Sequence, residues 1–413
     1  MQKILIIGYV WPEPNSSAAG GHMLSILRLF KQQDWQVEFA TPAQSTDHMI
    51  DLSDEGVSSS VITLNCDSFD NYISDYEPDI VLFDRFMMEE QFGWRIDKCC
   101  PNALKILDTE DLQCLRKARH QAHKADRAVT QSDLHSDIAK REIAAILRCD
   151  MSLIISSFEM ELLIGTYKVD SHLLFYLPFM VNLSKIDKAI TPYSQREHFM
   201  TIGNFRHAPN WDMVLYLQII WPLIRKQLPE TELHIYGSYP PPKATALHNP
   251  KNGFLIKGWA ENAFDVIQKS RICLAPIRFG AGIKGKLLDA MIAQTPSVTT
   301  TVGAEGMYDP NKDSWPGMVA DDITDIVNAS VKLYKNEDEW QHAQQGTIPL
   351  LKAHYDSKAL GNQLISRIID VQENLHQHRL NNFTGAMLKH HSMMSTKYMS
   401  QWITEKNKKN SNN

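Results

Sequence analysis

Short apolar runs separated by amphipathic helical stretches constrain this chain more than any other feature of its sequence. From residue 3 to residue 177 such runs recur, with helical periodicity between them. Strands buried on both faces carry continuous apolar sequence, whereas half-exposed strands alternate. The pattern therefore predicts an α/β fold in which a parallel sheet is covered by helices on both faces. The expected strands of the first half are 3–8, 36–40, 80–83, 103–107, 152–155 and 172–177.

The alternation stops once and then restarts, which predicts two domains. Residues 181–197 are irregular and contain Pro192, and a chain of 413 residues exceeds one typical domain. We expect a Rossmann-like domain at 1–180, a linker at 181–197, a second Rossmann-like domain at 198–377 and a polar, partly disordered tail at 378–413. Doubly wound sheets bind ligands at the carboxyl ends of their strands, so the site is expected in the cleft between the domains. The expected strands of the second half are 199–203, 232–236, 253–257, 272–277 and 297–300.

Several local patterns predict the shapes of helices. Residues 110–147 form one long polar stretch with helical character. The sequence Ser156-Ser157-Phe158-Glu159 is typical of a capping box that starts the next helix. Pro222 lies inside the helical pattern of 211–226, so we expect a kink or a break there. In the tail, one helix is expected near residues 384–404, with disorder at the last residues.

The composition is that of an ordinary soluble globular protein. Hydrophobic residues make up 43% and charged residues 22%, and the formal net charge of −6 argues against a nucleic-acid binder. No apolar run approaches the roughly 18 residues of a spanning helix, and the apolar start at 4–10 is too short for a signal peptide. We therefore expect a cytoplasmic protein. The basic tail leaves two alternatives, peripheral contact with the acidic inner face of a membrane or a solvated tail.

The cysteines and histidines show no metal-binding pattern. The six cysteines are scattered without a C-x-x-C pair, and the sixteen histidines include no H-E-x-x-H motif. We expect buried reduced thiols, surface histidines and no metal site.

The segment 280–287, GAGIKGKL, is the strongest candidate binding motif. It follows an apolar strand and opens a helix, so backbone N–H groups, the helix dipole and lysine charge would meet an anion there. It almost matches the phosphate loop of NTPases, but Leu287 replaces the hydroxyl residue that would hold Mg²⁺. Three interpretations remain: a metal-free diphosphate site that uses Lys284, an NTP loop assisted by Asp84, or a plain turn with exposed lysines.

Three further positions each allow two interpretations. Asp289 could accept ribose hydroxyls, or it could be a favourable acid near the first turn of a helix. Arg206 follows the first strand of the second domain and could face the cleft or lie in an exposed loop. Gly20-Gly21 opens a helix after the first strand but does not fit G-x-G-x-x-G, so it is a cleft-facing loop or a flexible turn.

Residues 199–307 resemble the carboxyl-terminal domain of glycosyltransferase family 4, which has the GT-B fold. The matching pieces occur in the order and spacing of the family, and the amino-terminal half is more loosely similar. The chain resembles in particular a subgroup of the family that has a GAGIKGK turn. The resemblance does not extend to the tail. The matching pieces are TIGNFRHAPNWD, LPETELHIYGSYPPP, FLIKGWAENA, RICLAPIRFGAGIKGKLLDAM and PSVTTTVGAEGM in the second half, and KILIIGYVWPEPNSSAAGGH, DIVLFDRF and ILDTEDLQCLRKAR in the first.

The resemblance implies a retaining, hexosyltransferase-type glycosyltransferase that needs no metal and no cofactor besides a nucleotide-diphosphate sugar as co-substrate. It would transfer the sugar to a glycan or lipid-linked acceptor in the synthesis of a cell-surface or secreted polysaccharide. The first domain would be the acceptor side and the second would bind the donor. By position, Lys284 and Arg206 would hold the diphosphate and stabilise the leaving group, and Asp289 would bind the ribose. Donor-binding residues would further include Gly20, Gly21, Gly282, Ile283, Gly285 and Glu305.

The sequence departs from the family pattern at two positions. The first acid of the family's E-x7-E pair falls at Ala281, a feature that the GAGIKGK subgroup shares. Many relatives have a histidine where Gln113 stands, so no general base is identified, and Asp111 is a weaker candidate for orienting acceptor or donor. Two rival functions follow: a sugar-nucleotide epimerase on the same fold, and a binding module that has lost catalysis.

Overall fold

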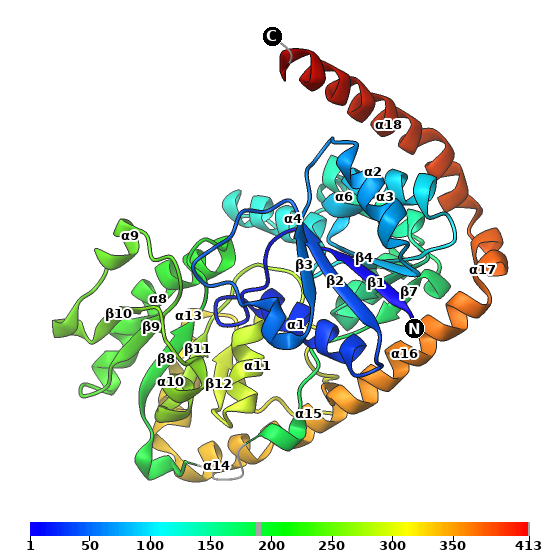
Figure 1. The fold of residues 1–413 in the computed structure, drawn as a ribbon. Helices are drawn as coiled ribbons and strands as arrows, with labels where there is room; N and C mark the ends of the chain where they lie inside the picture. Colours follow the sequence, from blue (N-terminus) through cyan, green and yellow to red (C-terminus); the bar gives the residue numbers. More distant parts are fainter. Residues whose placement is uncertain (187–190, 412–413) are drawn as a thin grey trace.

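The computed structural model describes residues 1–186 and 191–411, which form two α/β units side by side (Figure 1). The first unit has a seven-stranded sheet of order β3-β2-β1-β4-β5-β6-β7, and the second has a six-stranded sheet of order β10-β9-β8-β11-β12-β13. All paired strands within both sheets run parallel. Two doubly wound parallel sheets confirm the predicted fold class.

The first unit alternates strands and helices along residues 3–176. Its central strands carry the apolar runs of the sequence, and every residue of β4 and β5 is buried. The strands are β1 (Lys3–Ile7), β2 (Gln36–Thr41), β3 (Ser58–Val61), β4 (Ile80–Asp84), β5 (Leu104–Asp108), β6 (Met151–Ile154) and β7 (Leu174–Tyr176). The helices are α1 (Ala18–Lys31), α2 (Ser68–Tyr76), α3 (Phe86–Cys99), α4 (Gln113–Lys124), α5 (Gln131–Leu134), α6 (Asp137–Arg148) and α7 (Ser157–Gly165).

The second unit repeats this plan, and all five strands expected there are present. The sequence pattern missed β13, a three-residue edge strand, and β3 in the first unit, because neither carries an apolar run. The strands are β8 (Glu197–Ile202), β9 (Leu233–Tyr236), β10 (Phe254–Gly258), β11 (Ser270–Ala275), β12 (Ser297–Thr299) and β13 (Gly317–Val319). The helices are α8 (Ala208–Gln227), α9 (Pro242–Thr245), α10 (Ala263–Lys269), α11 (Gly285–Ile292), α12 (Thr301–Ala304), α13 (Ile323–Lys335), α14 (Glu337–Gln345) and α15 (Thr347–His354).

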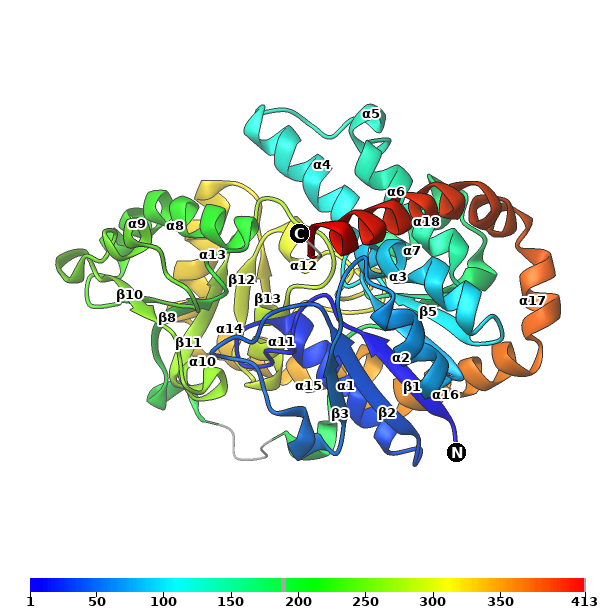
Figure 2. The ribbon, with the colours of Figure 1, turned by 45° about the horizontal axis from the view of Figure 1, so that its top comes forward.

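The chain returns to the first unit after α15. α16 (Ser357–Glu373) buries Leu364 and Ile368 in the same apolar cluster as β1 and α1. α17 (Leu375–Asn381) and α18 (Phe383–Ser411) then wrap around the outside of the first unit, as Figure 2 shows. The sequence prediction placed residues up to 377 in the second domain, whereas the structure places α16 against the first sheet. No described helix is long and apolar enough to cross a membrane.

Three local predictions are confirmed only in part or corrected. The stretch 110–147 is not one helix but three, α4, α5 and α6. The predicted break at Pro222 is absent, since α8 is one helix there. Pro222 lies on its exposed face, where the freed carbonyl group can be hydrated. The tail is helical as far as Ser411, and the predicted disorder at 412–413 falls outside the described residues.

The capping box at Ser156 is also wrong. The Ser156 side chain makes no capping hydrogen bond to α7. Glu159 instead turns away from the start of its own helix and accepts hydrogen bonds from Leu112 and from Gly282 of the second unit. The Glu159 carboxylate therefore makes tertiary hydrogen bonds and does not cap its own helix.

Candidate functional site

The glycine turn at the carboxyl end of β11 meets the start of α1 from the opposite unit. Lys284 is the N-cap of α11, and Gly282 has a φ of +61°, a left-handed conformation that favours glycine. A Cβ atom added to Gly285 would overlap the Cβ atom of Ala18, the first residue of α1. The positive ends of two helix dipoles therefore converge on one place, which favours a bound anion.

Lys284 and Lys286 both lie within this junction. Lys284 is only 7% exposed, and its Nζ atom donates to the Gly282 carbonyl oxygen at 2.8 Å. Burial lowers its pKa to about 8, against the opposing effect of the Glu305 carboxylate. The Nζ atom of Lys286 donates to Asn210 Oδ1 at 2.6 Å, and burial lowers its pKa to about 8 as well. The turn thus concentrates cationic side chains in a place of low solvation, where an anion would be held strongly. The alternative of a plain turn with exposed lysines does not fit this burial.

Side chains of the first unit hold the turn from the other side. Arg119 donates to both carboxylate oxygens of Glu305, at 2.7 and 2.8 Å, and to the Gly280 carbonyl oxygen at 2.9 Å. Glu159 accepts the Gly282 N–H at 2.9 Å, and it is fully buried. Burial raises the pKa of Glu159 to about 8. These contacts join the two units at the motif itself.

Arg119 and Glu159 were not singled out from the sequence. Arg119 lies within the motif CLRKAR, which carries the resemblance, but nothing in its spacing indicates a partner 186 residues away. The sequence around Glu159 predicted a capping box at the start of its own helix and not a contact with the second unit.

Ala281 occupies the position of the missing family acid and packs against the apolar cluster of the first unit. A carboxylate at this position would have to be desolvated by those apolar neighbours, which costs several kcal/mol without a partner. A Cβ atom added to Gly282 would lie 2.8 Å from the Asp111 Cβ atom, so the turn and Asp111 are in close contact. Asp111 itself pairs with Arg116, whose Nη1 atom lies 2.6 Å from its carboxylate.

The remaining candidates of the second unit lie around the turn in different environments. Arg206 is exposed, and its guanidinium carbon lies 3.7 Å from the centre of the Tyr239 ring. Asp289 is accessible to solvent but has protein on most sides, and desolvation raises its pKa to about 6. It lies beyond the first turn of α11, so the first-turn interpretation is corrected. Ile283 packs into the core of the second unit, so only its backbone can face a ligand.

Gly20 and Gly21 lie in the first turn of α1 rather than in a loop before it. Their N–H groups donate to Ser17, the N-cap residue, through its hydroxyl and its carbonyl oxygen. A Cβ atom on Gly20 would overlap the backbone of Glu13, whereas the space beside Gly21 is open. Gly20 therefore serves close packing, and Gly21 leaves the mouth of the junction clear.

A buried acidic group adjoins α1 at the carboxyl ends of β4 and β5. Asp84 and Arg85 line one hollow together with Trp11, Gly20 and Glu110. Burial, reinforced by the nearby Asp108 charge, raises the pKa of Glu110 to about 8. Arg85 and Glu110 have φ values of +70° and +62°, so backbone strain is stored in both loops. Carboxylate and carboxyl oxygens at this density can accept and donate hydrogen bonds to a polyhydroxylated molecule.

His22, which follows Gly21, is buried in the same acidic group. Its Nε2 atom lies 3.7 Å from Asp108. Burial lowers and the Asp108 charge raises the pKa of His22, and the net direction is upward. Neither ring nitrogen of His22 has a hydrogen-bond partner among the described residues.

Gln113, which stands where many relatives have a histidine, and the two histidines that follow it in α4 have other partners. The Gln113 amide contacts the Met87 sulfur at 3.6 Å, so it is turned into the first unit. His120 stacks on Phe279 with 4.6 Å between ring centres, and His123 lies 3.2 Å from Asp212. Both histidines therefore contact the second unit beside the turn.

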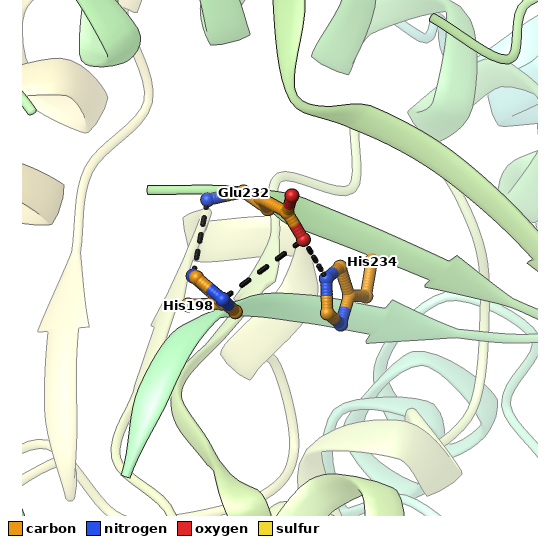
Figure 3. A group of neighbouring side chains, drawn as sticks. All are labelled: His198, Glu232 and His234. Carbon is orange, nitrogen blue, oxygen red and sulfur yellow. Dashed lines mark hydrogen bonds and ion pairs between the residues drawn. The ribbon is translucent and has the colours of Figure 1, made fainter. Parts of the chain in front are cut away.

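One group of three potential metal ligands occurs among the described residues, His198, Glu232 and His234 (Figure 3). It lies at the amino-terminal ends of β8 and β9, at the opposite edge of the sheet from the glycine turn. His234 Nε2 lies 2.7 Å from the Glu232 carboxylate, and His198 Nδ1 accepts the Glu232 N–H at 3.2 Å. This acceptor role places the proton of neutral His198 on Nε2, the atom nearest the carboxylate. Hydrogen bonds therefore account for the cluster without an ion.

Comparison with known proteins gives a family match in the second unit and a fold match for nearly the whole chain. Residues 196–336 match the family model described as Glycosyl transferases group 1. No curated protein matches the sequence.

Several solved structures share the fold. HepE from Anabaena, solved with UDP and glucose, is 9% identical with a TM-score of 0.68, and the match covers 90% of this chain and 100% of that one. A TarM variant from S. aureus, solved with Fondaparinux, alpha-GlcNAc-glycerol and UDP, is 11% identical with a TM-score of 0.67 and the same coverage. Sucrose-phosphate synthase from Thermosynechococcus elongatus is 14% identical with a TM-score of 0.66, covering 90% of this chain and 99% of that one. At such identities the likeness shows the fold, which is GT-B.

Proposed function

We propose that this protein is a retaining glycosyltransferase that moves a sugar from a nucleotide-diphosphate sugar to a glycan or lipid-linked acceptor. The observation that carries the proposal is the buried Lys284 at the head of α11, facing the start of α1 within a GT-B fold. The family match at 196–336 and the UDP bound in the HepE and TarM structures support a nucleotide-diphosphate donor.

The donor diphosphate is the group that fits the junction of the two helices. Lys284 and the positive helix ends stabilise the charge that develops on the leaving diphosphate, and Arg206 approaches from the rim. Leu287 supplies no oxygen for a cation, so we propose that lysine charge takes the place of a metal at this turn. Asp289, accessible beside α11, is the proposed ribose acceptor.

The acidic hollow of the first unit is proposed to receive the sugar hydroxyl groups and the acceptor. Asp111 touches the glycine turn and would orient the reacting groups. We assign no side chain as general base, because the departing phosphate can take the acceptor proton in retaining transfer. A role in polysaccharide synthesis at the cytoplasmic face of a membrane is part of the same proposal.

The test is a thermal-shift screen of UDP, GDP, ADP and dTDP and of their hexose derivatives, followed by product analysis. A nucleotide that binds only the folded protein, and is present at a concentration of 100 times its Kd, stabilises the fold by about 2.7 kcal/mol. The stabilising sugar nucleotide should then be consumed with an acceptor panel, and NMR should show the anomeric configuration retained. The proposal fails if the donor alone is converted to an isomeric sugar nucleotide, which is epimerase activity, or if tight binding occurs with neither transfer nor slow hydrolysis, which is the property of a binding module.

A further inference from the structure

α18 is an unusual addition to the first unit because one face is anchored and the opposite face is apolar and bare. The helix packs against α3 and α6. Ser400 accepts a hydrogen bond from buried Arg95 at 3.2 Å, and Thr404 donates to the Asn65 carbonyl oxygen at 2.8 Å. These contacts fix the rotation of the helix, so the opposite face is held outward.

The outward face carries a stripe of large apolar side chains, with the exposed His390 and His391 between its two ends. Phe383 is 75% exposed, Tyr398 57% and Trp402 59%. Their spacing, together with two methionines, follows the helical repeat and places them on one side of the helix. Single exposed apolar residues are common, but a stripe of this length marks a surface that meets something apolar. The stripe consists of Phe383, Met387, Met394, Tyr398 and Trp402, with Met399 at its edge.

Positive charge accompanies the stripe. The Nζ atom of Lys397 lies 5.9 Å from the centre of the Tyr398 ring, and that of Lys406 lies 5.1 Å from the centre of the Trp402 ring. Residues 383–413 contain five lysines and one glutamate, a formal charge of +4, whereas the whole chain carries −6. The rest of the protein is therefore strongly acidic, and Lys397 and Lys406 bring positive charge to the edges of the apolar stripe.

This combination identifies the chemistry of the partner. Aromatic and methionine side chains flanked by lysines suit the boundary between acyl chains and anionic headgroups, where rings lie at headgroup level and lysines reach phosphate. A second copy would offer the exposed apolar residues Leu215, Ile219 and Leu223 of α8 to the stripe. An anionic bilayer offers both apolar depth and the negative charge that suits the lysines beside the stripe.

We propose that α18 is a membrane-docking helix that lies in the headgroup region of an anionic bilayer and holds the first unit at the lipid surface. The inference extends the proposed function, in which the first unit receives a lipid-linked acceptor. Its test uses only vesicle binding, so it can fail or succeed independently of transfer activity.

The experiment measures co-sedimentation of the full chain with vesicles of phosphatidylcholine alone and of an equal mixture with phosphatidylglycerol. The wild type should bind the mixed vesicles, and added salt should weaken that binding because it screens the lysine charge. The variant Met394→Ser/Tyr398→Ser/Trp402→Ser and the variant Lys397→Glu/Lys406→Glu should each lower the partition coefficient by about tenfold or more.

The matched control is Ile219→Ser/Leu223→Ser, which removes two exposed apolar side chains from α8 of the second unit and should bind vesicles as the wild type does. Circular dichroism and thermal unfolding of all variants confirm that they fold. The proposal is overturned if the stripe variants bind as well as the wild type, or if the α8 variant loses binding equally. It is also overturned if sedimentation velocity shows a dimer that the stripe variant dissociates, since the stripe would then join two copies.

Discussion

At the scale of single residues, the buried Lys284 is charged only at a cost in free energy. A pKa displaced from 10.5 to about 8 corresponds to about 3 kcal/mol by which the fold disfavours the charged form. The Lys284 Nζ atom bonds only a carbonyl oxygen among the hydrogen bonds described, and the nearby Glu305 carboxylate is paired with Arg119. An incoming diphosphate would supply a counter-charge.

Replacing Lys284 with alanine should therefore reduce kcat by about 10²–10³, because charge on the leaving diphosphate loses its stabilising partner. Steady-state kinetics with the stabilising donor measures the effect. The matched control is Lys312→Ala, a lysine of the second unit whose side chain is 80% exposed, and it should leave the rate unchanged. Near-normal turnover of a folded Lys284→Ala protein would remove this residue from the mechanism.

The same pKa predicts how donor binding depends on pH. Lysine is charged below its pKa, so affinity for a nucleoside diphosphate should be constant up to about pH 8 and then fall towards tenfold per pH unit. The ligand does not change charge in this range, because phosphate groups ionise near pH 6. Calorimetric titration of UDP between pH 7 and 9 tests this. Lys284→Met should bind weakly with a shallower profile, because Lys286, with a pKa of about 8, still titrates. An equal slope in that variant would assign the titration to another group.

At the scale of elements, the site depends on how closely two helices approach end to end. α11 belongs to the second unit and α1 to the first. Gly285 faces Ala18 across the junction and has no side chain that would overlap it. Alanine in place of glycine would favour α11 as a helix by about 1 kcal/mol. The glycine is therefore required by the partner unit and not by the helix that contains it.

The variant Gly285→Ala should lower kcat/KM for the donor by at least about tenfold while leaving the thermal midpoint almost unchanged. The double variant Ala18→Gly/Gly285→Ala should restore activity, because it removes the overlapping Cβ atom from the other side. A matched control is Gly165→Ala at the end of α7, where an added Cβ atom meets nothing within 4 Å. If Ala18→Gly fails to rescue, the defect lies within α11.

For the whole molecule, a few hydrogen bonds close the space between the two units. Arg119 and Glu159 bind the glycine turn from the first unit, and α16 returns from the second to the first sheet. Closure of this kind excludes water from a reacting donor and so limits hydrolysis. Apolar contacts accompany these polar ones, including the stacking of His120 on Phe279 and the packing of Ala281 against the first unit.

Removing the Arg119 side chain should shift the protein towards a more open arrangement. Arg119→Ala should increase the radius of gyration in donor-free solution and raise KM for the donor, measured by small-angle scattering and kinetics. Arg141→Ala is the control, because Arg141 makes a similar two-oxygen pair with Glu90 inside the first unit and should change neither quantity. An unchanged radius with normal KM would show that the Arg119–Glu305 pair does not govern closure.

The sequence by itself determined the architecture and the position of the glycine turn, because apolar periodicity and glycine conformation are local properties. It predicted two doubly wound sheets, the strand before the turn, and the anion-binding character of residues 280–287. Only the tertiary structure decided that Glu159 bonds the turn rather than its own helix, that Arg119 grips Glu305, and that α16 belongs to the first core. Each of these depends on residues distant in the chain being brought within hydrogen-bond or packing distance, and no local pattern records which distant partner that will be.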